Sequence, residues 1–459
     1  MKLRCLITAA LLLAASIAVA EKATDHPAVG TWVGAAEAGA GGYRFDLELK
    51  LEDGELAGEI VLVSEGSVRM PADKIEVEEN RIRVVTMQGA ISISGEIDGE
   101  TITGKLHTPS DDLPMRLARA DSDAARRMLA GMEEERKALR SKPLVLVRSG
   151  PGMETVDPKA LEALLADADS SFTTALALMH DGELVGEWYR GEAPEPVETM
   201  SVTKVALNLI IGRMITLGRL ESVDTPVHAF YPQWADDEVR ASITIRQLLA
   251  HSSGLDRGQP AAPIYHSGDF VQFALDAPME FEPGTQVAYS NNGTNLLGGI
   301  IGQLADKPLT EFLAEDLFGL IGIEEFTWHP DPAGNPQGMA GLKLKAADLA
   351  RLGQLALDHG RWQGEQLINA DWFEESFAPA TEHSARVGLI WFLDRDGEDE
   401  AVVGISHSGH LGQWLGARFD NRVVGARLIA QSPAYEVETD VFMDFVQRLG
   451  GLAPAADRH

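Results

Sequence analysis

Ser201 and Lys204 stand three residues apart in the stretch ETMSVTKVALNLII, residues 198–211, where an apolar run begins. Positions i and i+3 share one face of a helix, so the Lys204 amine can reach the Ser201 hydroxyl. The run is apolar on most sides, which predicts a buried helix. Burial and the positive end of the helix dipole both favour a neutral amine, which is a base able to activate a serine. The helix N-terminus also offers backbone N–H groups to a developing oxyanion.

A second group able to transfer protons comes from Tyr289, in the stretch YSNNG. Tyr289 and Asn291 form the only Tyr-x-Asn of the sequence. They follow a Pro-Gly turn and precede an apolar run that predicts a helix, a loop position from which side chains can project into a cleft. A phenol placed there can share acid and base work with Lys204.

A third element is expected at a strand edge further along the chain, where His407, Ser408 and Gly409 follow one another. The pattern His-x-Gly occurs elsewhere in the chain as well. Only its order after the first two elements, and its place before the strand-like run 422–429, selects His407. A histidine beside glycine at a strand can equally cap a loop, so both interpretations of His407 stay open.

With these three motifs in this order, the sequence resembles the serine β-lactamase-like, penicillin-recognising superfamily. The form Ser-x-x-Lys, Tyr-x-Asn, His-x-Gly is similar to its class C-like branch, which includes family VIII esterases, D-amino-acid peptidases and 6-aminohexanoate-oligomer hydrolases. The resemblance covers residues 143–450. Four further segments carry it: LLAHSSGL at 248–255, PGT at 283–285, DLARLGQL at 348–355 and GHLGQ at 409–413.

The resemblance implies an α+β fold of the β-lactamase/transpeptidase type, with an antiparallel sheet flanked by helices, a helical lobe, and the active site between them. It implies that Ser201 attacks an acyl carbonyl and forms an acyl-enzyme, while Lys204 and Tyr289 share the base and acid work. The backbone N–H groups of Ser201 and His410 would form the oxyanion hole. Asn291 would hold the substrate or Lys204 by hydrogen bonds.

The third motif departs from the family's usual pattern. Typical β-lactamases and transpeptidases of this superfamily have Lys-Thr-Gly there, and that lysine attracts a substrate carboxylate, whereas this chain contains no Lys-x-Gly. His407, with Gly409, would bind or support the substrate, but a histidine is mostly neutral near pH 7 and is a poorer anion anchor. An esterase, amidase or D-aminopeptidase is therefore favoured. A β-lactamase or D,D-peptidase acting on cell-wall peptides is the alternative, and a non-catalytic binding protein on the same fold is a third.

Other residues of this region that could contribute to a site have structural interpretations too. We expect His251 to be a structural hydrogen-bonding residue. Trp391 and Trp414 adjoin apolar runs and can either line an acyl pocket or belong to the core. The Asp, Glu and His residues show no metal-binding spacing such as His-x-x-x-His, so we expect no metal and no cofactor.

The hydrolase-like region is preceded by two other segments. Residues 21–120 contain short alternating strands separated by turns, which predicts a small all-β barrel or sandwich domain, more plausibly a spacer or lid support than a binding module. Residues 121–142 form a charged helical pattern and predict a helical linker. Residues 143–459 alternate strands with long apolar helices and form the predicted hydrolase domain.

The first 20 residues, MKLRCLITAALLLAASIAVA, have the layout of a cleavable signal peptide. We expect cleavage after Ala20, a periplasmic or secreted protein, and no membrane-spanning segment after cleavage. The only cysteine, Cys5, lies in this leader, so the mature chain would form no disulfide. A formal charge of −31 disfavours nucleic acid and anionic membranes as partners. The expected partner is a small-molecule or peptide substrate with an ester or amide bond, and the oligomeric state is left open.

Overall fold

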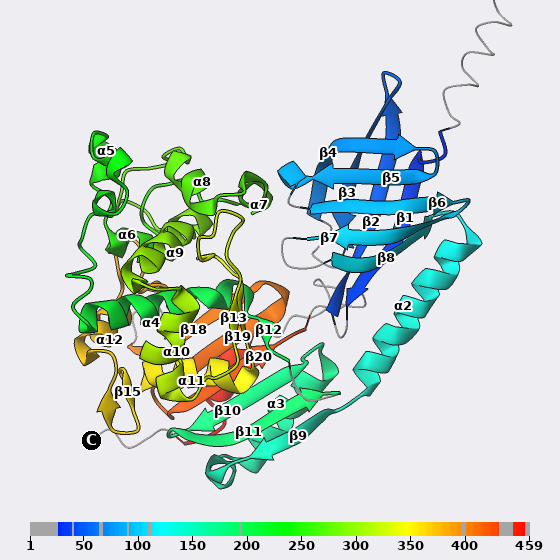
Figure 1. Ribbon diagram of the computed structural model, residues 1–459. Helices are drawn as coiled ribbons and strands as arrows, with labels where there is room; N and C mark the ends of the chain where they lie inside the picture. Colours follow the sequence, from blue (N-terminus) through cyan, green and yellow to red (C-terminus); the bar gives the residue numbers. More distant parts are fainter. Residues whose placement is uncertain are drawn as a thin grey trace, which may run out of the picture. The chain divides into compact units, whose positions relative to one another are not determined.

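The computed structural model describes residues 26–38, 41–63, 68–89, 91–108, 112–191, 195–259, 261–395, 401–430 and 444–454. The predicted signal peptide, residues 1–20, lies outside these described residues. The chain forms two compact units, and the division falls between Arg136 and Lys137. Figure 1 shows the strands of the first unit in blue to cyan and most of the second unit in green to red.

The first unit contains a closed barrel of eight antiparallel strands. The strands are β1 (Gly30–Ala38), β2 (Gly41–Glu52), β3 (Glu55–Leu62), β4 (Val68–Glu78), β5 (Arg81–Thr86), β6 (Ile91–Asp98), β7 (Thr101–His107) and β8 (Asp112–Arg119). Each strand pairs with the next, and β1 pairs with β8 to close the ring. The predicted all-β domain is therefore a barrel, and the sandwich alternative does not apply.

Inward-facing side chains fill this barrel, as the period-two pattern requires. Trp32, Phe45, Leu47 and Ile60 are completely buried. The indole N–H of Trp32 donates to the carbonyl oxygen of Ala28 at 2.9 Å, so that its polar atom is satisfied. The interior of the barrel is thus a packed core.

Helix α2 (Asp123–Ser141) follows the barrel and lies within the predicted helical segment 121–142. Near its start, Ala125 packs against Val33 and Ala118 on the outside of the barrel wall. The boundary between the two compact units falls inside this helix. The domain limits at residues 120 and 142 therefore stay a prediction.

The second unit is built on a seven-stranded antiparallel sheet of order β17-β18-β19-β20-β10-β11-β9. Its strands are β9 (Leu144–Ser149), β10 (Ala175–His180), β11 (Glu183–Arg190), β17 (Phe392–Arg395), β18 (Val402–Gly409), β19 (Gln413–Arg418) and β20 (Val423–Leu428). Shorter strands lie outside this sheet: β12 (Val197–Glu198), β13 (Thr327–Trp328), β14 (Leu342–Leu344), β15 (Arg361–Trp362) and β16 (Glu365–Gln366).

Helices cover the sheet and form a lobe beside it (Figure 1). They are α3 (Pro158–Ser170), α4 (Thr203–Thr216), α5 (Glu238–Ala241), α6 (Ile245–Leu249), α7 (Ala262–Ser267), α8 (Phe270–Asp276), α9 (Asn291–Ala305), α10 (Leu309–Asp316), α11 (Ala346–Leu357), α12 (Ala370–Ser376) and α13 (Phe445–Leu449). The predicted sheet flanked by helices, with a helical lobe, is confirmed. Within the described part of the chain, no helix is both long and apolar enough to cross a membrane.

Both faces of the sheet are buried, and β10 shows how its residues divide between them. Ala175, Ala177 and Met179 belong to the large core that includes residues of α4 and α11. Leu176 and Leu178 belong to a separate core formed with α3 and α13. Because neighbouring side chains of a strand point to opposite faces, a strand covered on both sides must be apolar throughout.

Asn208 anchors α4 to its surroundings, and it is fully buried. Its Nδ2 atom donates to Ser376 Oγ at 3.0 Å and to the carbonyl oxygen of Leu389 at 2.9 Å. Its Oδ1 atom accepts from the indole N–H groups of Trp372 at 3.3 Å and Trp391 at 3.1 Å. One amide therefore satisfies four groups from the segment 372–391, and it lies one helical turn after Lys204.

Replacement of Asn208 by leucine leaves several buried donors and acceptors unsatisfied, and the expected loss is about 3 kcal/mol or more of the free energy of unfolding. Urea denaturation followed by circular dichroism measures it. The matched control is Asn369→Ala, because Asn369 is exposed and its side chain caps nothing. Equal stability of Asn208→Leu and the wild-type protein would contradict this role for the amide.

Candidate active site

Ser201 lies where a 3-10 turn, Met200–Val202, leads into α4. Met200 has a positive φ of 50°, which is uncommon for a residue with a side chain. Such a conformation costs free energy and occurs preferentially at functional sites. Ser201 itself is partly exposed, whereas the following residues of α4 are buried almost without interruption.

Lys204 is completely buried on the first turn of α4, as the pattern of the sequence predicts. Its Nζ atom lies 3.3 Å from Ser201 Oγ and donates to the carbonyl oxygen of Met339 at 2.8 Å. Burial holds the pKa of the Lys204 amine well below its usual range. The amine is therefore poised to be neutral, with a lone pair beside the serine hydroxyl.

Tyr289 lies on the loop before α9, and its ring faces the same amine. The Lys204 Nζ atom is 4.9 Å from the centre of the Tyr289 ring. Burial raises the pKa of the Tyr289 phenol to about 12, against a hydrogen bond with the Ser201 side chain that lowers it. The phenol therefore keeps its proton at neutral pH and can donate it. The structure brings Ser201, Lys204 and Tyr289 together.

Asn291 begins α9 and contacts a neighbouring loop. Its Nδ2 atom donates to the carbonyl oxygen of Gly258 at 3.3 Å, and its backbone N–H donates to the carbonyl oxygen of Arg257 at 2.8 Å. These contacts fix the loop of residues 256–258 beside the site. They give Asn291 a supporting place there, whereas the Lys204 amine bonds to Ser201 and Met339.

Asn295, one turn further along α9, holds Met339 in position. Its Oδ1 atom accepts from the backbone N–H of Met339 at 3.0 Å. Sequence analysis missed both residues. Asn295 carries a weak signal as a polar residue in an apolar run, whereas a backbone carbonyl such as that of Met339 carries none.

His251 lies beside Tyr289, with their ring centres 4.7 Å apart. Its Nδ1 atom accepts from the backbone N–H of Ser290 at 3.2 Å, so the ring proton belongs on Nε2. Burial lowers the pKa of His251 to about 3. His251 is thus a neutral ring that packs against the Tyr289 ring and accepts a hydrogen bond from the Ser290 backbone.

His407 lies near the end of β18 and is completely buried. Its Nδ1 atom makes a 2.9 Å hydrogen bond with the carbonyl oxygen of Ser408, and its ring stacks on Phe392 with centres 4.9 Å apart. Because that carbonyl can only accept, Nδ1 must donate. Burial is the largest cause that lowers the pKa of His407 to about 3. The ring is therefore neutral at physiological pH.

Gly409 ends β18 directly against the segment that carries the serine. A Cβ atom on Gly409 would lie 2.8 Å from the carbonyl oxygen of Thr199 and 3.1 Å from the Cβ of Met200. The next turn contains Leu411 with a positive φ of 66°, and Arg427 Nη1 donates to the carbonyl oxygen of Gly412 at 2.9 Å. This turn includes His410 and lies next to the 3-10 turn that carries Ser201.

The two tryptophans belong to the core. Trp391 is completely buried and donates to Asn208, and Trp414 packs partly buried against the core cluster that includes α3 and α13. Of the two interpretations left open by the sequence, the structure thus favours the core for both. Within the described residues, no group of three or more His, Cys, Asp and Glu side chains gathers in a way that could hold a metal ion.

Two curated relatives match the hydrolase region. One is the putative D-alanyl-D-alanine carboxypeptidase of Escherichia coli (strain K12), 24% identical over 276 residues, which are 46% of this chain and 62% of the relative. The other is the 6-aminohexanoate-dimer hydrolase of Paenarthrobacter ureafaciens, 24% identical over 311 residues, which are 60% of this chain and 78% of the relative. Over several curated relatives the match spans between 43% and 62% of their length.

Solved structures of low sequence identity share the fold. The crystal structure of a family VIII carboxylesterase matches with a TM-score of 0.50 and 17% identity, over 66% of this chain and 98% of that one. The model of the family named Beta-lactamase matches residues 160–446, which is more than half of the chain. The resemblance predicted from the three motifs is confirmed. The chain belongs to the Beta-lactamase family, and its curated relatives include a putative D-alanyl-D-alanine carboxypeptidase and a 6-aminohexanoate-dimer hydrolase.

Proposed function

We propose that this protein is a periplasmic or secreted serine hydrolase that cleaves an ester or amide bond through an acyl-enzyme on Ser201. One observation carries the proposal: the Lys204 amine is completely buried, 3.3 Å from the Ser201 hydroxyl, with its pKa held far below the usual range by burial. A buried lysine with no role would cost stability, whereas one that is neutral beside a hydroxyl is a general base.

In the proposed acylation step, Ser201 Oγ attacks the carbonyl carbon of the substrate while the Lys204 amine takes the hydroxyl proton. The carbon becomes tetrahedral, and its oxygen carries the negative charge. The backbone N–H groups of Ser201 and His410 donate to that oxygen. Donors of this kind contribute about 3–4 kcal/mol each in comparable sites.

Collapse of the tetrahedral intermediate breaks the bond to the leaving alcohol or amine. That leaving group needs a proton, and Tyr289 is suited to deliver it because a pKa of about 12 keeps its phenol protonated at neutral pH. Lys204, now protonated, restores the phenol. Water then attacks the acyl-enzyme with the same groups in reverse roles, and the acid product leaves.

The histidines of the site are neutral, which supports substrates that need no positive group to bind a carboxylate. His407 stands where many relatives of the superfamily would have a lysine, and its pKa of about 3 keeps it neutral. His251 is neutral as well. A neutral acyl ester or amide is thus favoured over a β-lactam or a cell-wall peptide with a terminal carboxylate. The carboxypeptidase relative keeps the D,D-peptidase as the second candidate.

The proposed protein is exported from the cytoplasm and has three segments after its signal peptide. Residues 1–20 would act as a signal peptide that exports the chain, residues 21–120 and 121–142 would form the barrel domain and the linker, and residues 143–459 would form the hydrolase domain. A protein exported in this way meets small esters, amides and peptides from outside the cytoplasm.

We expect Ser201→Ala to lose about 10³-fold or more of the turnover of p-nitrophenyl butyrate, because the nucleophile is gone. Steady-state hydrolysis by the purified protein measures it, and intact mass after reaction with a fluorophosphonate reports acylation. The matched control is Ser170→Ala on the surface of α3, which keeps full activity.

Three results would count against the proposal. Wild-type turnover that persists in Ser201→Ala would remove Ser201 as the nucleophile. Faster hydrolysis of nitrocefin than of the ester by 10-fold in kcat/KM would favour the β-lactamase or D,D-peptidase. A folded protein that neither hydrolyses nor is acylated by any of these reagents would favour a non-catalytic binding protein.

The neutrality of the two histidines predicts acid sensitivity. Their folded pKa values of about 3 lie below the ordinary 6.5, so the unfolded chain binds more protons between pH 3 and 6.5. The free energy of unfolding therefore falls as the pH is lowered through this window, by up to about 1.4 kcal/mol per pH unit for each histidine.

Urea unfolding at several pH values between 7 and 4 measures this slope. His407→Asn keeps a donor for the Ser408 carbonyl and His251→Asn keeps an acceptor for the Ser290 N–H. Each variant should show a shallower slope than the wild-type protein. Slopes equal to that of the wild-type protein would mean that the histidines are protonated in the folded state.

A further inference from the structure

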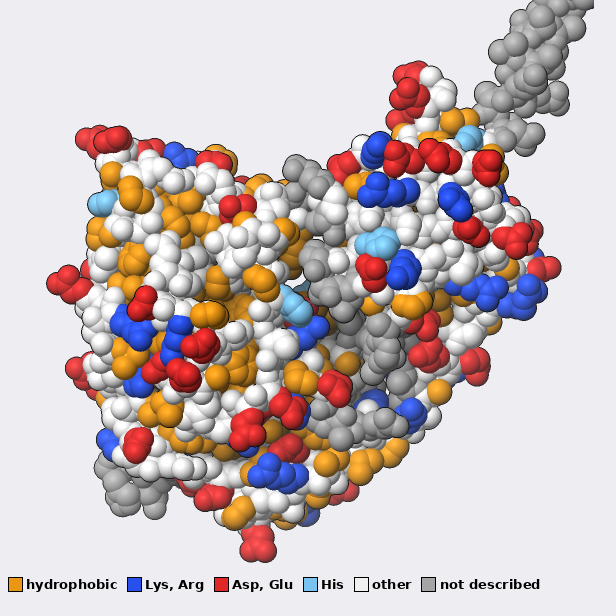
Figure 2. Space-filling model, viewed as in Figure 1, with side chains coloured by type: hydrophobic (Ala, Val, Ile, Leu, Met, Phe, Trp, Pro, Cys, Tyr) orange, Lys and Arg blue, Asp and Glu red, His pale blue; other side chains and the backbone are white. Residues whose placement is uncertain are grey.

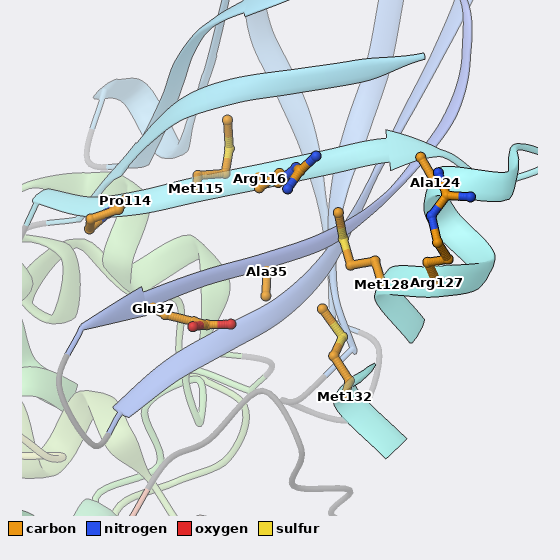
Figure 3. Close-up of a pocket in the computed structure, with 9 residues that line it drawn as sticks. All are labelled: Ala35, Glu37, Pro114, Met115, Arg116, Ala124, Arg127, Met128 and Met132. Carbon is orange, nitrogen blue, oxygen red and sulfur yellow. The ribbon is translucent and has the colours of Figure 1, made fainter. Parts of the chain in front are cut away.

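A hollow of about 620 Å³ lies on the outside of the barrel, between strands β1 and β8 and the first half of α2 (Figure 3). All of its lining residues belong to the first compact unit. Its volume is within the range of small-molecule sites. It is distinct from the interior of the barrel, which is filled by side chains such as Trp32 and Phe45.

The hollow lies beside a small apolar contact between the helix and the barrel wall. There, Ala125 contacts Val33 and Ala118. Further along α2, Met128 and Met132 line the hollow, and the barrel wall contributes the small side chain of Ala35 to it. Methionine is flexible and polarisable and adapts its shape to an apolar ligand.

Apolar and cationic groups share this hollow. Pro114 and Ala35 contribute apolar surface from the barrel wall, opposite the two methionines. Arg116 extends from β8 on the side facing α2, while the adjacent Met115 points in a different direction (Figure 3). Register explains the difference, because Arg116 pairs with Ala35 and Met115 with Ala36, on alternate faces of the wall.

The two arginines that line the hollow, Arg116 and Arg127, differ in their ion pairing from other arginines of the first unit. Arg69 is paired with glutamates, and Arg126 with Asp123. Arg116, by contrast, makes no hydrogen bond or ion pair with any residue that the structure describes. Arg127 likewise forms neither with a described residue, although its charge acts on Asp123.

Figure 2 shows acidic side chains spread over the visible surface, with lysines and arginines among them. In a protein with a formal charge of −31, two guanidinium groups on facing elements without a carboxylate partner are available to an external anion. Glu37, on β1, is the one acidic residue of the lining. Two positive charges and one negative charge leave the hollow with a net charge of +1.

We propose that this hollow binds an amphipathic monoanion: an unbranched acyl chain packs between Met128, Met132 and Ala35, and its carboxylate is held by Arg116 and Arg127. The chain supplies apolar area, and the carboxylate supplies the acceptors that the guanidinium groups lack. Glu37 disfavours ligands of higher negative charge. This site is independent of the proposed hydrolysis at Ser201.

Sodium laurate below its micelle concentration is the probe, and isothermal titration calorimetry with the mature full-length protein measures its affinity. We expect one laurate per chain. Arg116→Gln and Arg127→Gln each weaken binding about 10-fold, the cost of one charge-assisted hydrogen-bonded contact. Ala35→Phe, which fills the hollow, abolishes it.

The matched control is Arg126→Gln, which removes the same charge from the same turn of α2 but belongs to an existing ion pair, and which leaves the laurate affinity unchanged. Melting temperature and ester hydrolysis, unchanged in Arg116→Gln, show that the protein is folded. Dodecyltrimethylammonium and dodecyl maltoside, which carry the same chain without the anion, bind at least 10-fold more weakly.

Several outcomes would overturn the proposal. No laurate binding, or binding insensitive to Arg116 and Arg127, would exclude the site. Equal affinity for the three amphiphiles would indicate a merely apolar hollow. Binding only to vesicles of anionic phospholipid, without affinity for free laurate, would indicate attachment to a membrane surface in place of a single ligand.

Discussion

The burial of the Lys204 amine is the constraint on which the rest of the site depends. An ammonium group taken out of water costs several kcal/mol unless it is paired or gives up its proton. Here the neighbours of the amine are a serine hydroxyl, a backbone carbonyl and the face of a phenol ring. Such neighbours favour the neutral amine, and a neutral amine is a base that can accept the proton of the Ser201 hydroxyl. Asn295 and Asn208 then hold the carbonyl and the helix that keep this environment in place.

The same desolvation extends across the site and defines its character. Tyr289 keeps its proton while His251 and His407 lose theirs, so that the groups around the serine are neutral together at physiological pH. A neutral site provides a base and an acid without a fixed charge to attract a substrate carboxylate. A site with a lysine in the third motif would carry such a charge, so the neutral site supports the proposal that acyl esters or amides are the substrates.

Sequence could predict the residues whose spacing is local and the elements whose period is clear. Ser201 and Lys204 share one helix face, and the alternation over residues 45–51 requires a strand. It could not predict the carbonyl of Met339, because every residue has a backbone carbonyl and this one lies 135 residues from Lys204 in the sequence. Nor could it choose a barrel over a sandwich, since both give period two and only the pairing of β1 with β8 closes the ring. Asn208, a polar residue in an apolar helix, carried a signal that was overlooked.

The ionisation of Lys204 tests the central claim most directly. With lysine labelled by ¹³C at Cε, an NMR titration of the mature protein reports the state of each amine, and the resonance missing in Lys204→Arg assigns this one. We expect the assigned resonance to have the chemical shift of a neutral amine at pH 7.5, while the surface lysines remain protonated to about pH 10. A Lys204 resonance that stays that of an ammonium group up to pH 10 would contradict it.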